Sequence, residues 1–456
     1  MAESLIVEKI NSCLNFFQNK LSFLTDNSLI LTNIDKIILF AIIILLVSTS
    51  FASTDTIGFF ALSVISLSVL KIFLIKGQKF EFRIFDFAFI IYLLFCIIST
   101  INSTLPAQSV YGLSKTLIYA GFYFSILQYL KTNRSSLKLI VTVIALLVSA
   151  ESVIGLLQNN AEVMAGATWQ DTTSLNPEEV MTRVFGTIKP LNPNLYAAYI
   201  LAGLWSLPCL FLNKLLTKNF KTAAICAAFS LFAFAAIFLS GCRGAYVGLA
   251  AFCVTIFCLI YKVLNYNFNI SEKIKRLFAA FAASLFGLVT IVVVSTPALL
   301  KRVLSIFTTR GDSSSSFRMN VYNAGIEMFR DNFWLGIGCG NKVFREIYGL
   351  YMLSGFDALS AYCIYLEIGI ESGIFALVAF IVFLVFLIKD AFCSLCSEIS
   401  VENKIFILCA AASLLGVMLH GFVDTVFFRP PVQILFWSFV AVINVSLNCE
   451  VKNEKI

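Results

Sequence analysis

The sequence has little charge and almost no histidine. Only 13% of its 456 residues are charged, whereas a soluble domain carries roughly 25%, so a soluble core cannot account for a chain that is 59% hydrophobic. The single histidine, His420, excludes metal centres built from several histidines. Cys393 and Cys396 form a CxxC pair, but no second pair completes a tetrahedral zinc site. We therefore expect neither a metal nor a cofactor.

The sequence also lacks the period-two alternation of polar and apolar residues that is typical of a transmembrane barrel. It contains long apolar runs instead, such as Ile37–Phe51 and Leu277–Val294, which approach the roughly 20 residues of a membrane-crossing helix. We predict an all-α, polytopic membrane protein with about twelve transmembrane helices. Their expected positions are 37–53, 56–75, 84–102, 110–130, 138–157, 193–213, 221–240, 244–264, 276–297, 360–388, 404–427 and 430–448.

The short connections between these spans alternate in basic content. Lys131, Arg134 and Lys138 belong to a basic set, whereas the connections at 52–56 and 102–108 contain no lysine or arginine. Basic short loops stay in the cytoplasm, so the alternation predicts an inner (plasma) membrane protein with both termini cytoplasmic. The long loops 158–192 and 298–359 then lie outside. The net charge of +7 reflects this topology, and we expect lipid rather than nucleic acid beside the basic loops.

The topology divides the chain into five parts. Residues 1–36 are expected to form a cytoplasmic helix on the membrane surface, because apolar residues recur there at helical spacing. Residues 37–297 and 360–448 form the two parts of the transmembrane bundle. Between the ninth and tenth spans, residues 298–359 form an extracytoplasmic helical loop. Residues 449–456 are a cytoplasmic tail.

Ionisable residues embedded in the spans gather near the predicted outer face. An ionised group at mid-membrane costs about 3 kcal/mol, so such groups usually pair with one another or line a wet cavity. Any single one could instead snorkel to the interface or form a local ion pair, but the set as a whole predicts a shared polar cavity that opens outward. Its members are Lys115, Glu151, Arg243, Glu367, Glu371, His420 and Asp424, with Arg429 just beyond.

Two of these carboxylates are four residues apart. Glu367 and Glu371 therefore share a helix face, where like charges repel unless a cation lies between them. We predict a basic partner for at least one of them, with Arg243, Arg318 and Arg429 as the candidates.

The turn 240–245 joins two spans with almost no loop and carries Arg243 between two glycines. A guanidinium presents a planar fork of donors that suits phosphate oxygens. We predict that Arg243 is the principal ligand of an anion, over which Arg183 and Arg318 close from the two long loops. Before the sixth span, Asn192-Pro193-Asn194 suits a helix start, where N–H groups bind an anion or are simply capped.

Several segments, in this order, resemble the motifs of the O-antigen ligase/polymerase superfamily. They are Phe185–Thr187 with Asn192–Asn194, Gly241–Gly244, Gly336–Asn341 and Leu366–Gly373. A narrower resemblance, in Ala358–Tyr362 and from His420–Asp424 through Arg429, is to the IctB-type branch, whose members are often labelled bicarbonate transporters.

The superfamily resemblance implies transfer of a glycan at the outer face of the inner membrane, from a polyprenyl-diphosphate donor and without a metal. Arg243 matches a family arginine that holds the diphosphate. The family's acceptor-deprotonating histidine is replaced here by Tyr362, and a neutral tyrosine with a pKa near 10 is a poor base at pH 7. Glu367 or His420 could substitute for it.

The candidate residues follow from these motifs and from the embedded charges. The candidate catalytic residues are Arg243, Glu367 and Tyr362. The candidate substrate-binding residues are Arg183, Asn192, Asn194, Arg318, His420, Asp424 and Arg429. The partners are membrane lipid, a polyprenyl-diphosphate glycolipid and an extracytoplasmic acceptor that the sequence does not identify.

Two other functions stay open. A transporter of bicarbonate or another small anion needs polar access through both leaflets, commonly with paired internal repeats, whereas this chain has no visible repeat and apolar inner halves of its spans. A non-catalytic glycolipid-binding relative would fit the tyrosine at position 362. The sequence favours the ligase-like enzyme over both.

Overall fold

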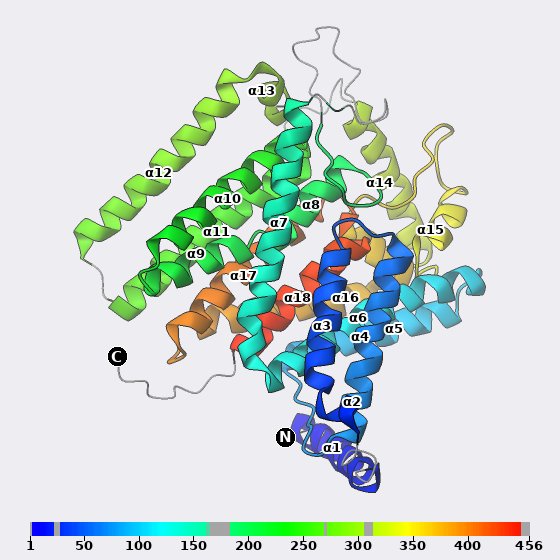
Figure 1. The fold of residues 1–456 in the computed structure, drawn as a ribbon. Helices are drawn as coiled ribbons and strands as arrows, with labels where there is room; N and C mark the ends of the chain where they lie inside the picture. Colours follow the sequence, from blue (N-terminus) through cyan, green and yellow to red (C-terminus); the bar gives the residue numbers. More distant parts are fainter. Residues whose placement is uncertain are drawn as a thin grey trace.

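The computed structural model describes residues 2–21, 28–161, 163, 183–268, 271–304 and 313–447. Within these residues the regular structure is entirely helical, with no strand (Figure 1). The helices are α1 (Ala2–Leu21), α2 (Leu29–Thr32), α3 (Ile34–Ser48), α4 (Thr54–Leu74), α5 (Ile84–Ile101), α6 (Pro106–Thr132), α7 (Leu137–Asn160), α8 (Pro193–Gly203), α9 (Ser206–Leu216), α10 (Phe220–Leu239), α11 (Arg243–Phe268), α12 (Glu272–Ser295), α13 (Pro297–Leu304), α14 (Ser313–Asp331), α15 (Asn341–Tyr348), α16 (Ile364–Ser394), α17 (Val401–His420) and α18 (Pro430–Ser446).

Eight described segments are long and apolar enough to cross a membrane. They are α4, α5, α7 with the short 3-10 helix before it, α8 with α9, α10, α11, α16 and α17. Helix α18 is also apolar but has only 17 residues. The chain is therefore an all-helical, multi-pass membrane protein. The total of about twelve spans stays a prediction, and the tail 449–456 lies outside the described residues.

Three predicted spans differ from the helices, and one of them, 360–388, begins late, because α16 starts at Ile364. The span 193–213 consists of α8 and α9. The span 404–427 ends early, because α17 stops at His420 and the Gly421 carbonyl accepts a hydrogen bond from the Ile364 N–H (2.8 Å). Since Ile364 is also the first residue of α16, this bond joins the ends of two helices. Tyr362 and Asp424 consequently lie in connections and not in spans.

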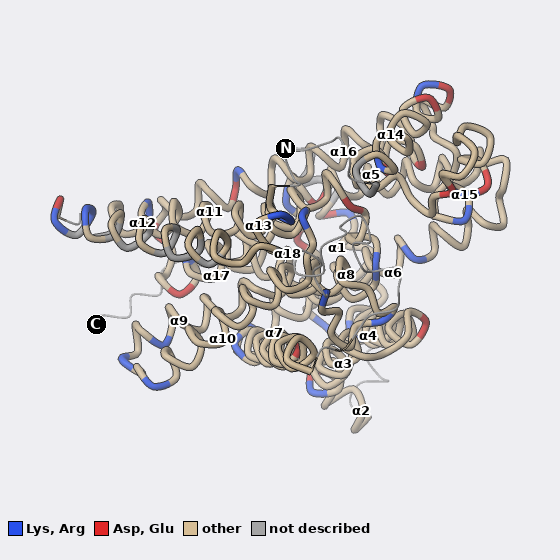
Figure 2. Tube along the Cα trace, turned by 90° about the horizontal axis from the view of Figure 1, so that it is seen from above, with Lys and Arg blue, Asp and Glu red and all other residues tan. Residues whose placement is uncertain are grey.

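Several hydrogen bonds join connections within the two sets that basic content predicts. In the predicted outer set, Thr187 donates from its hydroxyl to the Ser50 carbonyl (2.8 Å), and Ser103 donates in the same way to the Ile337 carbonyl (2.8 Å). In the predicted cytoplasmic set, Arg134 donates to the Val445 carbonyl (3.0 Å). Most of the tube in Figure 2 is free of charge, with the charged residues gathered in short stretches.

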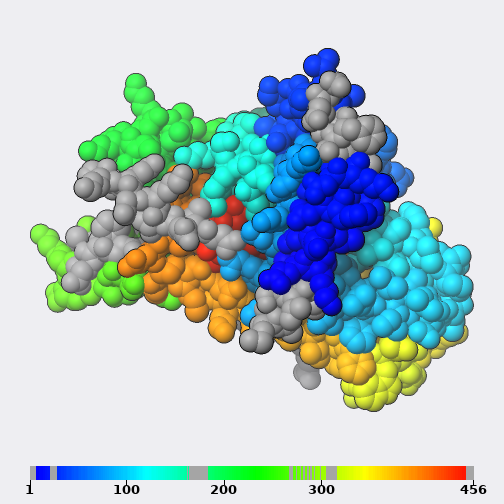
Figure 3. Space-filling model, turned by 90° about the horizontal axis from the view of Figure 1, so that it is seen from below, coloured from blue at the N-terminus to red at the C-terminus, as the bar shows by residue number. Residues whose placement is uncertain are grey.

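Helix α1 belongs to the predicted cytoplasmic set. Its Asn11 side chain donates to the Phe80 carbonyl (3.1 Å), and Gln18 donates to the Ile72 carbonyl (2.9 Å). Figure 3 shows α1 lying across the lower surface of the molecule. This position agrees with the predicted surface helix, while its attachment to a membrane stays a prediction.

Aromatic side chains fill the bundle near the predicted cytoplasmic end. The Trp437 ring packs against Phe89 (4.6 Å between ring centres), Tyr123 (5.3 Å) and Phe383 (5.9 Å). Beside them, the Tyr123 hydroxyl donates to buried Asp86 (2.5 Å). These contacts hold α5, α6, α16 and α18 together.

Helix α16 is broken near its outer third, where Gly373 has φ +78°. The chain before α15 uses this break, because the N–H groups of Ile337 and Gly338 donate to the carbonyls of Ile370 (2.9 Å) and Glu371 (3.0 Å). A Cβ at Gly373 would lie 2.1 Å from the Trp334 carbonyl oxygen. The glycine-rich segment 336–341 is thus a turn that packs closely against helices.

Candidate functional site

Four arginines line one small cavity of about 30 Å³ at the predicted outer end. Arg183 lies in the connection before α8, and Arg243 is the first residue of α11. Arg302 belongs to α13 and Arg318 to α14. The same cavity is lined by one acidic residue, Asp424. We call this the arginine cavity.

The short turn between α10 and α11 holds two of these arginines in place. Gly241 has φ +64°, which favours glycine. Arg183 donates from Nε to the Ser240 carbonyl (2.7 Å), and Arg302 donates from Nε to the Gly241 carbonyl (2.9 Å). A Cβ at Gly241 would lie 3.0 Å from Arg183 Nε. The turn therefore brings two guanidinium groups from distant segments next to Arg243.

Asp424 balances part of this positive charge. Its Oδ2 lies 3.4 Å from Arg318 Nη2 and accepts a hydrogen bond from Asn194 Nδ2 (2.9 Å). The Asn194 amide oxygen accepts in turn from Arg183 Nη2 (2.5 Å). Among the described residues that line the cavity, guanidinium groups therefore outnumber carboxylates by four to one. Such a cavity attracts an anion that carries more than one charge.

Burial and the neighbouring guanidinium groups of Arg302 and Arg318 lower the pKa of Arg183 to about 10. This pKa still lies far above neutral pH, so Arg183 remains charged at pH 7. The Arg183 guanidinium donates hydrogen bonds to the carbonyl of Ser240 and to the side-chain amide oxygen of Asn194.

Tyr362 lies beside the arginine cavity, where its ring packs against the Arg318 guanidinium. The Arg318 guanidinium carbon lies 5.4 Å from the centre of the Tyr362 ring. Burial, with nearby Asp424, raises the pKa of Tyr362. The hydroxyl is therefore protonated at pH 7 and is available as a hydrogen-bond donor, not as a base. Its backbone is in the left-handed region, with φ +51°.

Asn192 and His420 do not line the arginine cavity. Asn192 caps α8, because its Oδ1 accepts from the N–H groups of Asn194 (2.7 Å) and Leu195 (3.3 Å). The N–H groups that could have bound an anion are thus occupied by the cap. His420 is buried behind the Arg243 turn, with Nε2 3.5 Å from Cys242 Sγ.

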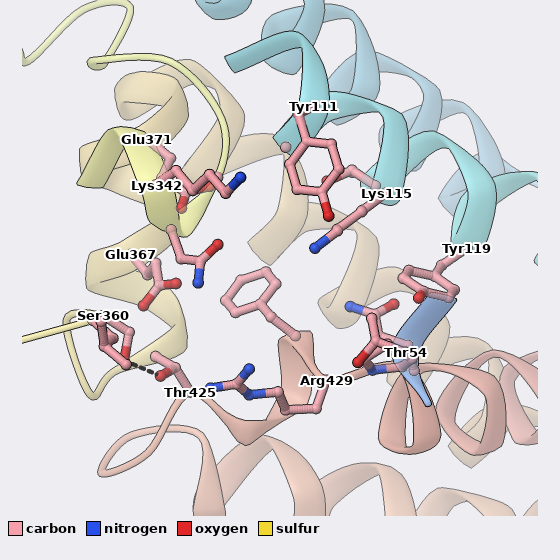
Figure 4. Close-up of a pocket in the computed structure, with 18 of the residues that line it drawn as sticks. Thr54, Tyr111, Lys115, Tyr119, Lys342, Ser360, Glu367, Glu371, Thr425 and Arg429 are labelled. Atoms are coloured by element: carbon pink, nitrogen blue, oxygen red, sulfur yellow. Dashed lines mark hydrogen bonds between the residues drawn. The ribbon is translucent and has the colours of Figure 1, made fainter. Parts of the chain in front are cut away.

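Glu367 and Arg429 line a second, larger cavity of about 160 Å³ (Figure 4). Glu371 lines it too, with Lys115 from α6 and Lys342 from α15. Glu367 is buried and accepts a hydrogen bond from the Ala361 N–H (3.0 Å). We call this the lysine cavity.

The expected basic partner of the two carboxylates is thus partly found. Arg429 attracts Glu367 across the lysine cavity, but no direct ion pair of Glu367 or Glu371 occurs among the described residues. Arg243 and Arg318, the other two candidates, line the arginine cavity instead.

The two cavities are separated by one stretch of backbone. Asp424 lines the arginine cavity, and the next residue, Thr425, lines the lysine cavity. The Thr425 hydroxyl donates to Ser360 Oγ (2.7 Å), which ties this stretch to the chain before α16. A ligand that reaches past this stretch would contact both cavities.

The sequence analysis missed Arg302 and Lys342. Neither residue belongs to a recognised motif, and both lie in the long segment between the ninth and tenth spans. Their one common signal is a basic side chain on the predicted outer side, where the short connections contain few lysines and arginines.

Among the described residues, no cluster of three or more histidine, cysteine, aspartate or glutamate side chains could hold a metal ion.

Part of the chain is similar to a known protein family. A search of curated proteins found no match to the chain. Residues 228–381 match the family model of the O-antigen ligases, a segment that runs from α10 into α16. It includes Arg243, Arg302, Arg318, Tyr362 and Glu367. The match supports the resemblance to the superfamily, and the chain is a multi-pass membrane protein similar to the O-antigen ligases.

Proposed function

We propose that the protein is a metal-independent, ligase-like glycosyltransferase that takes its glycan from a polyprenyl-diphosphate carrier. The observation that carries this proposal is the arginine cavity, where four guanidinium groups face one carboxylate. A diphosphate presents several charged oxygens to such a cluster. Each charge-assisted hydrogen bond contributes about 1.5–3 kcal/mol.

The same arginines would assist the transfer. An acceptor hydroxyl oxygen attacks the anomeric carbon of the glycan, and the bond from that carbon to the diphosphate oxygen breaks. Negative charge then develops on the leaving polyprenyl diphosphate, where the fixed donors Arg243, Arg302 and Arg318 stabilise it. The acceptor proton goes to a carboxylate, and we assign this role to Glu367, which must be ionised to accept it, a state that nearby Arg429 favours.

Arg243 is the principal ligand in this proposal. It begins α11 directly after the tight turn, so its position is fixed by the backbone. Asn194 and Asp424 orient Arg183 and Arg318 around the anion. His420 supports the turn from behind, and Arg429 acts in the neighbouring lysine cavity. Within the superfamily, we assign the chain to the IctB-type branch on its motifs at 358–362 and 420–429.

A non-catalytic glycolipid-binding protein is the second candidate, because a tyrosine stands at the position of the family's base. It shares the diphosphate site and differs only in turnover. A small-anion transporter is less favoured. Both cavities are lined by residues of the predicted outer connections and of the helix ends beside them, while aromatic side chains around Trp437 fill the bundle towards the other end.

The first experiment measures binding of undecaprenyl diphosphate to the full-length protein in lipid nanodiscs. Arg243→Lys keeps the charge but loses the planar fork, so it should weaken binding measurably, and Arg243→Ala should nearly abolish it. The matched control is Arg345→Ala, since Arg345 pairs with Asp357 on the exposed side of α15. Unchanged binding in a folded Arg243→Ala protein would contradict the proposal.

The second experiment separates the candidate functions. Release of undecaprenyl diphosphate from a glycan-loaded carrier indicates transfer, and Glu367→Gln should stop this release while binding remains. Binding without release in the unmodified protein would favour the non-catalytic candidate. Bicarbonate flux into vesicles that contain the protein, lost in Arg243→Ala, would favour the transporter.

A further inference from the structure

We propose that the lysine cavity is a subsite for an acidic sugar, meaning a monosaccharide that carries a carboxylate or a phosphate group. This inference rests on the proposed function, since it names the chemical class of the glycan or acceptor. It concerns side chains that the diphosphate site does not use.

Three cations line this cavity from three separate elements. Lys115 comes from α6, Lys342 from α15, and Arg429 immediately precedes α18. Among the described residues, none of the three has a carboxylate within ion-pair distance. Their charge is therefore not neutralised by a direct contact within this part of the protein.

The two lysines share one aromatic ring. Lys115 Nζ lies 4.4 Å and Lys342 Nζ 4.7 Å from the centre of the Tyr111 ring. Figure 4 shows both side chains extending into the cavity, with Lys342 and Lys115 on opposite sides. The two ammonium groups thus lie within a Debye length of about 10 Å of each other, so they repel one another. An anion that reaches both ammonium groups past the edge of the ring would offset this repulsion.

The cavity also offers acceptors that a simple inorganic anion would not need. The carboxylates of Glu367 and Glu371 line it, as do the side-chain amides of Gln108, Asn341 and Gln433. Carboxylates repel a phosphate ion but accept hydrogen bonds from hydroxyl groups. A ligand that satisfies both sets of groups carries an acidic group and several hydroxyls, as an acidic sugar does.

The size of the cavity suits one sugar ring. A cavity of about 150 Å³ in a protein core admits benzene, which is also a six-membered ring, and the lysine cavity measures about 160 Å³. Its wall at Thr425 adjoins Asp424 in the arginine cavity. A sugar here would lie next to the bound diphosphate, either as part of the donor glycan or as part of the acceptor.

The test compares acidic and neutral sugars on the full-length protein in nanodiscs. Methyl glucuronide and glucose phosphate should bind at least about tenfold more tightly than methyl glucoside, because a hydrogen bond to a charged group is about twice as strong as a neutral one. Lys342→Met and Lys115→Met should each remove most of this preference. Arg345→Met is the matched control, because Arg345 lies on the same helix as Lys342 but outside the cavity.

Equal binding of acidic and neutral sugars would overturn the inference. So would an unchanged preference in both lysine variants, provided that their thermal unfolding matches that of the unmodified protein. If one variant fails to fold, the other one still decides the result.

Two further measurements identify the source of the sugar. If it belongs to the donor, undecaprenyl-diphosphate glucuronate should bind more tightly than the corresponding glucose lipid, and Lys342→Met should remove the difference. If it belongs to the acceptor, methyl glucuronide should still bind when undecaprenyl diphosphate saturates the protein. Either result supports the subsite, and the absence of both overturns it.

Failure of the proposed function gives a different result. In that case undecaprenyl diphosphate does not bind, or Arg243→Ala does not affect its binding, whereas the preference for acidic sugars persists. Arg243 lines the arginine cavity and not the lysine cavity, so Arg243→Ala should leave that preference intact.

Discussion

At the scale of single residues, the arginine cavity depends on backbone carbonyls that hold guanidinium groups in place. Arg302 donates to the Gly241 carbonyl (2.9 Å) and lines the cavity with Arg243. We expect Arg302→Gln to weaken binding of undecaprenyl diphosphate about tenfold, since a hydrogen bond to a charged group contributes about 1.5–3 kcal/mol. Lys301→Gln removes the same charge one residue away, outside the cavity, and should have a much smaller effect. Equal losses in binding assays of the two variants would mean that only net charge matters.

The pKa of Arg183 sets the pH range of anion binding. Burial, with the charges of Arg302 and Arg318, lowers this pKa to about 10, so the side chain loses its proton at lower pH than an ordinary arginine. Affinity for the diphosphate should stay nearly constant from about pH 7.5 to pH 8.5, where the terminal phosphate has already lost its second proton, and fall as the pH rises towards about 10. Arg183→Gln should bind weakly throughout and lack this fall. Isotherms across this range check the prediction, and a decrease between about pH 7.5 and pH 8.5 would contradict it.

Tyr362 is expected to act through its ring. Its pKa is raised, so its hydroxyl stays protonated up to pH values above 10, and Arg318 lies over the ring. Tyr362→Phe should therefore bind the diphosphate nearly as well as the unmodified protein. Tyr362→Ala should bind about fivefold more weakly, because a cation–π contact contributes about 0.5–2 kcal/mol. A large loss of glycan transfer in Tyr362→Phe would instead assign chemistry to the hydroxyl.

At the scale of elements, helix α6 and the glycine-rich turn before α15 touch through their backbones. A Cβ at Gly112 would lie 2.2 Å from the Cys339 carbonyl oxygen and 2.6 Å from the Gly340 Cα. Gly112→Ala should destabilise the protein by about 1–3 kcal/mol, as overpacking does. It should also reduce sugar binding, because Gly112 and Gly340 both line the lysine cavity.

Helix α4 provides the matched control for this change. A Cβ at Gly58 has nothing within 4 Å, so Gly58→Ala should be neutral or stabilise the helix by about 0.5–1 kcal/mol. Thermal unfolding in detergent compares the two variants. Similar melting temperatures for both would show that the turn is not held against α6.

At the scale of the whole molecule, the connections form two ends, and orientation decides which compartment the cavities face. Met319 in α14 is 50% exposed and belongs to the predicted outer end. Lys138, with a side chain 71% exposed, belongs to the predicted cytoplasmic end. In a cysteine-free background, a membrane-impermeant thiol reagent should label Met319→Cys in intact cells, and Lys138→Cys only after permeabilisation. The reverse pattern would place both cavities in the cytoplasm and contradict the proposed function.

Much of the fold follows from composition and hydropathy. A bilayer requires about 20 apolar residues in each crossing helix, whatever that helix packs against. The predicted spans therefore coincide closely with helices such as α4, α5 and α10. The predicted end of the span 404–427 was wrong by several residues, because α17 stops at His420, where the N–H of the distant Ile364 donates a hydrogen bond to the Gly421 carbonyl.

The candidate site was only partly predictable. Sequence reasoning placed Arg183, Arg243 and Arg318 around one anion, and the structure brings these three to one cavity, while their role as ligands stays a prediction. It also placed Glu367 and Arg429 in a single shared cavity with them. The structure distributes most of these residues over two cavities that adjoin at Asp424 and Thr425, and Glu151 and His420 line neither.

The sequence by itself determined that the chain is a multi-pass helical membrane protein and which connections share an end. Both properties depend on local composition, which each segment carries independently of the others. Only the tertiary structure decided that Arg302 joins the arginine cavity and that Lys115 meets Lys342 across Tyr111. These meetings depend on how α13 packs against the turn before α11 and how α15 packs against α6, and packing between segments more than 50 residues apart leaves no periodic signal in the sequence.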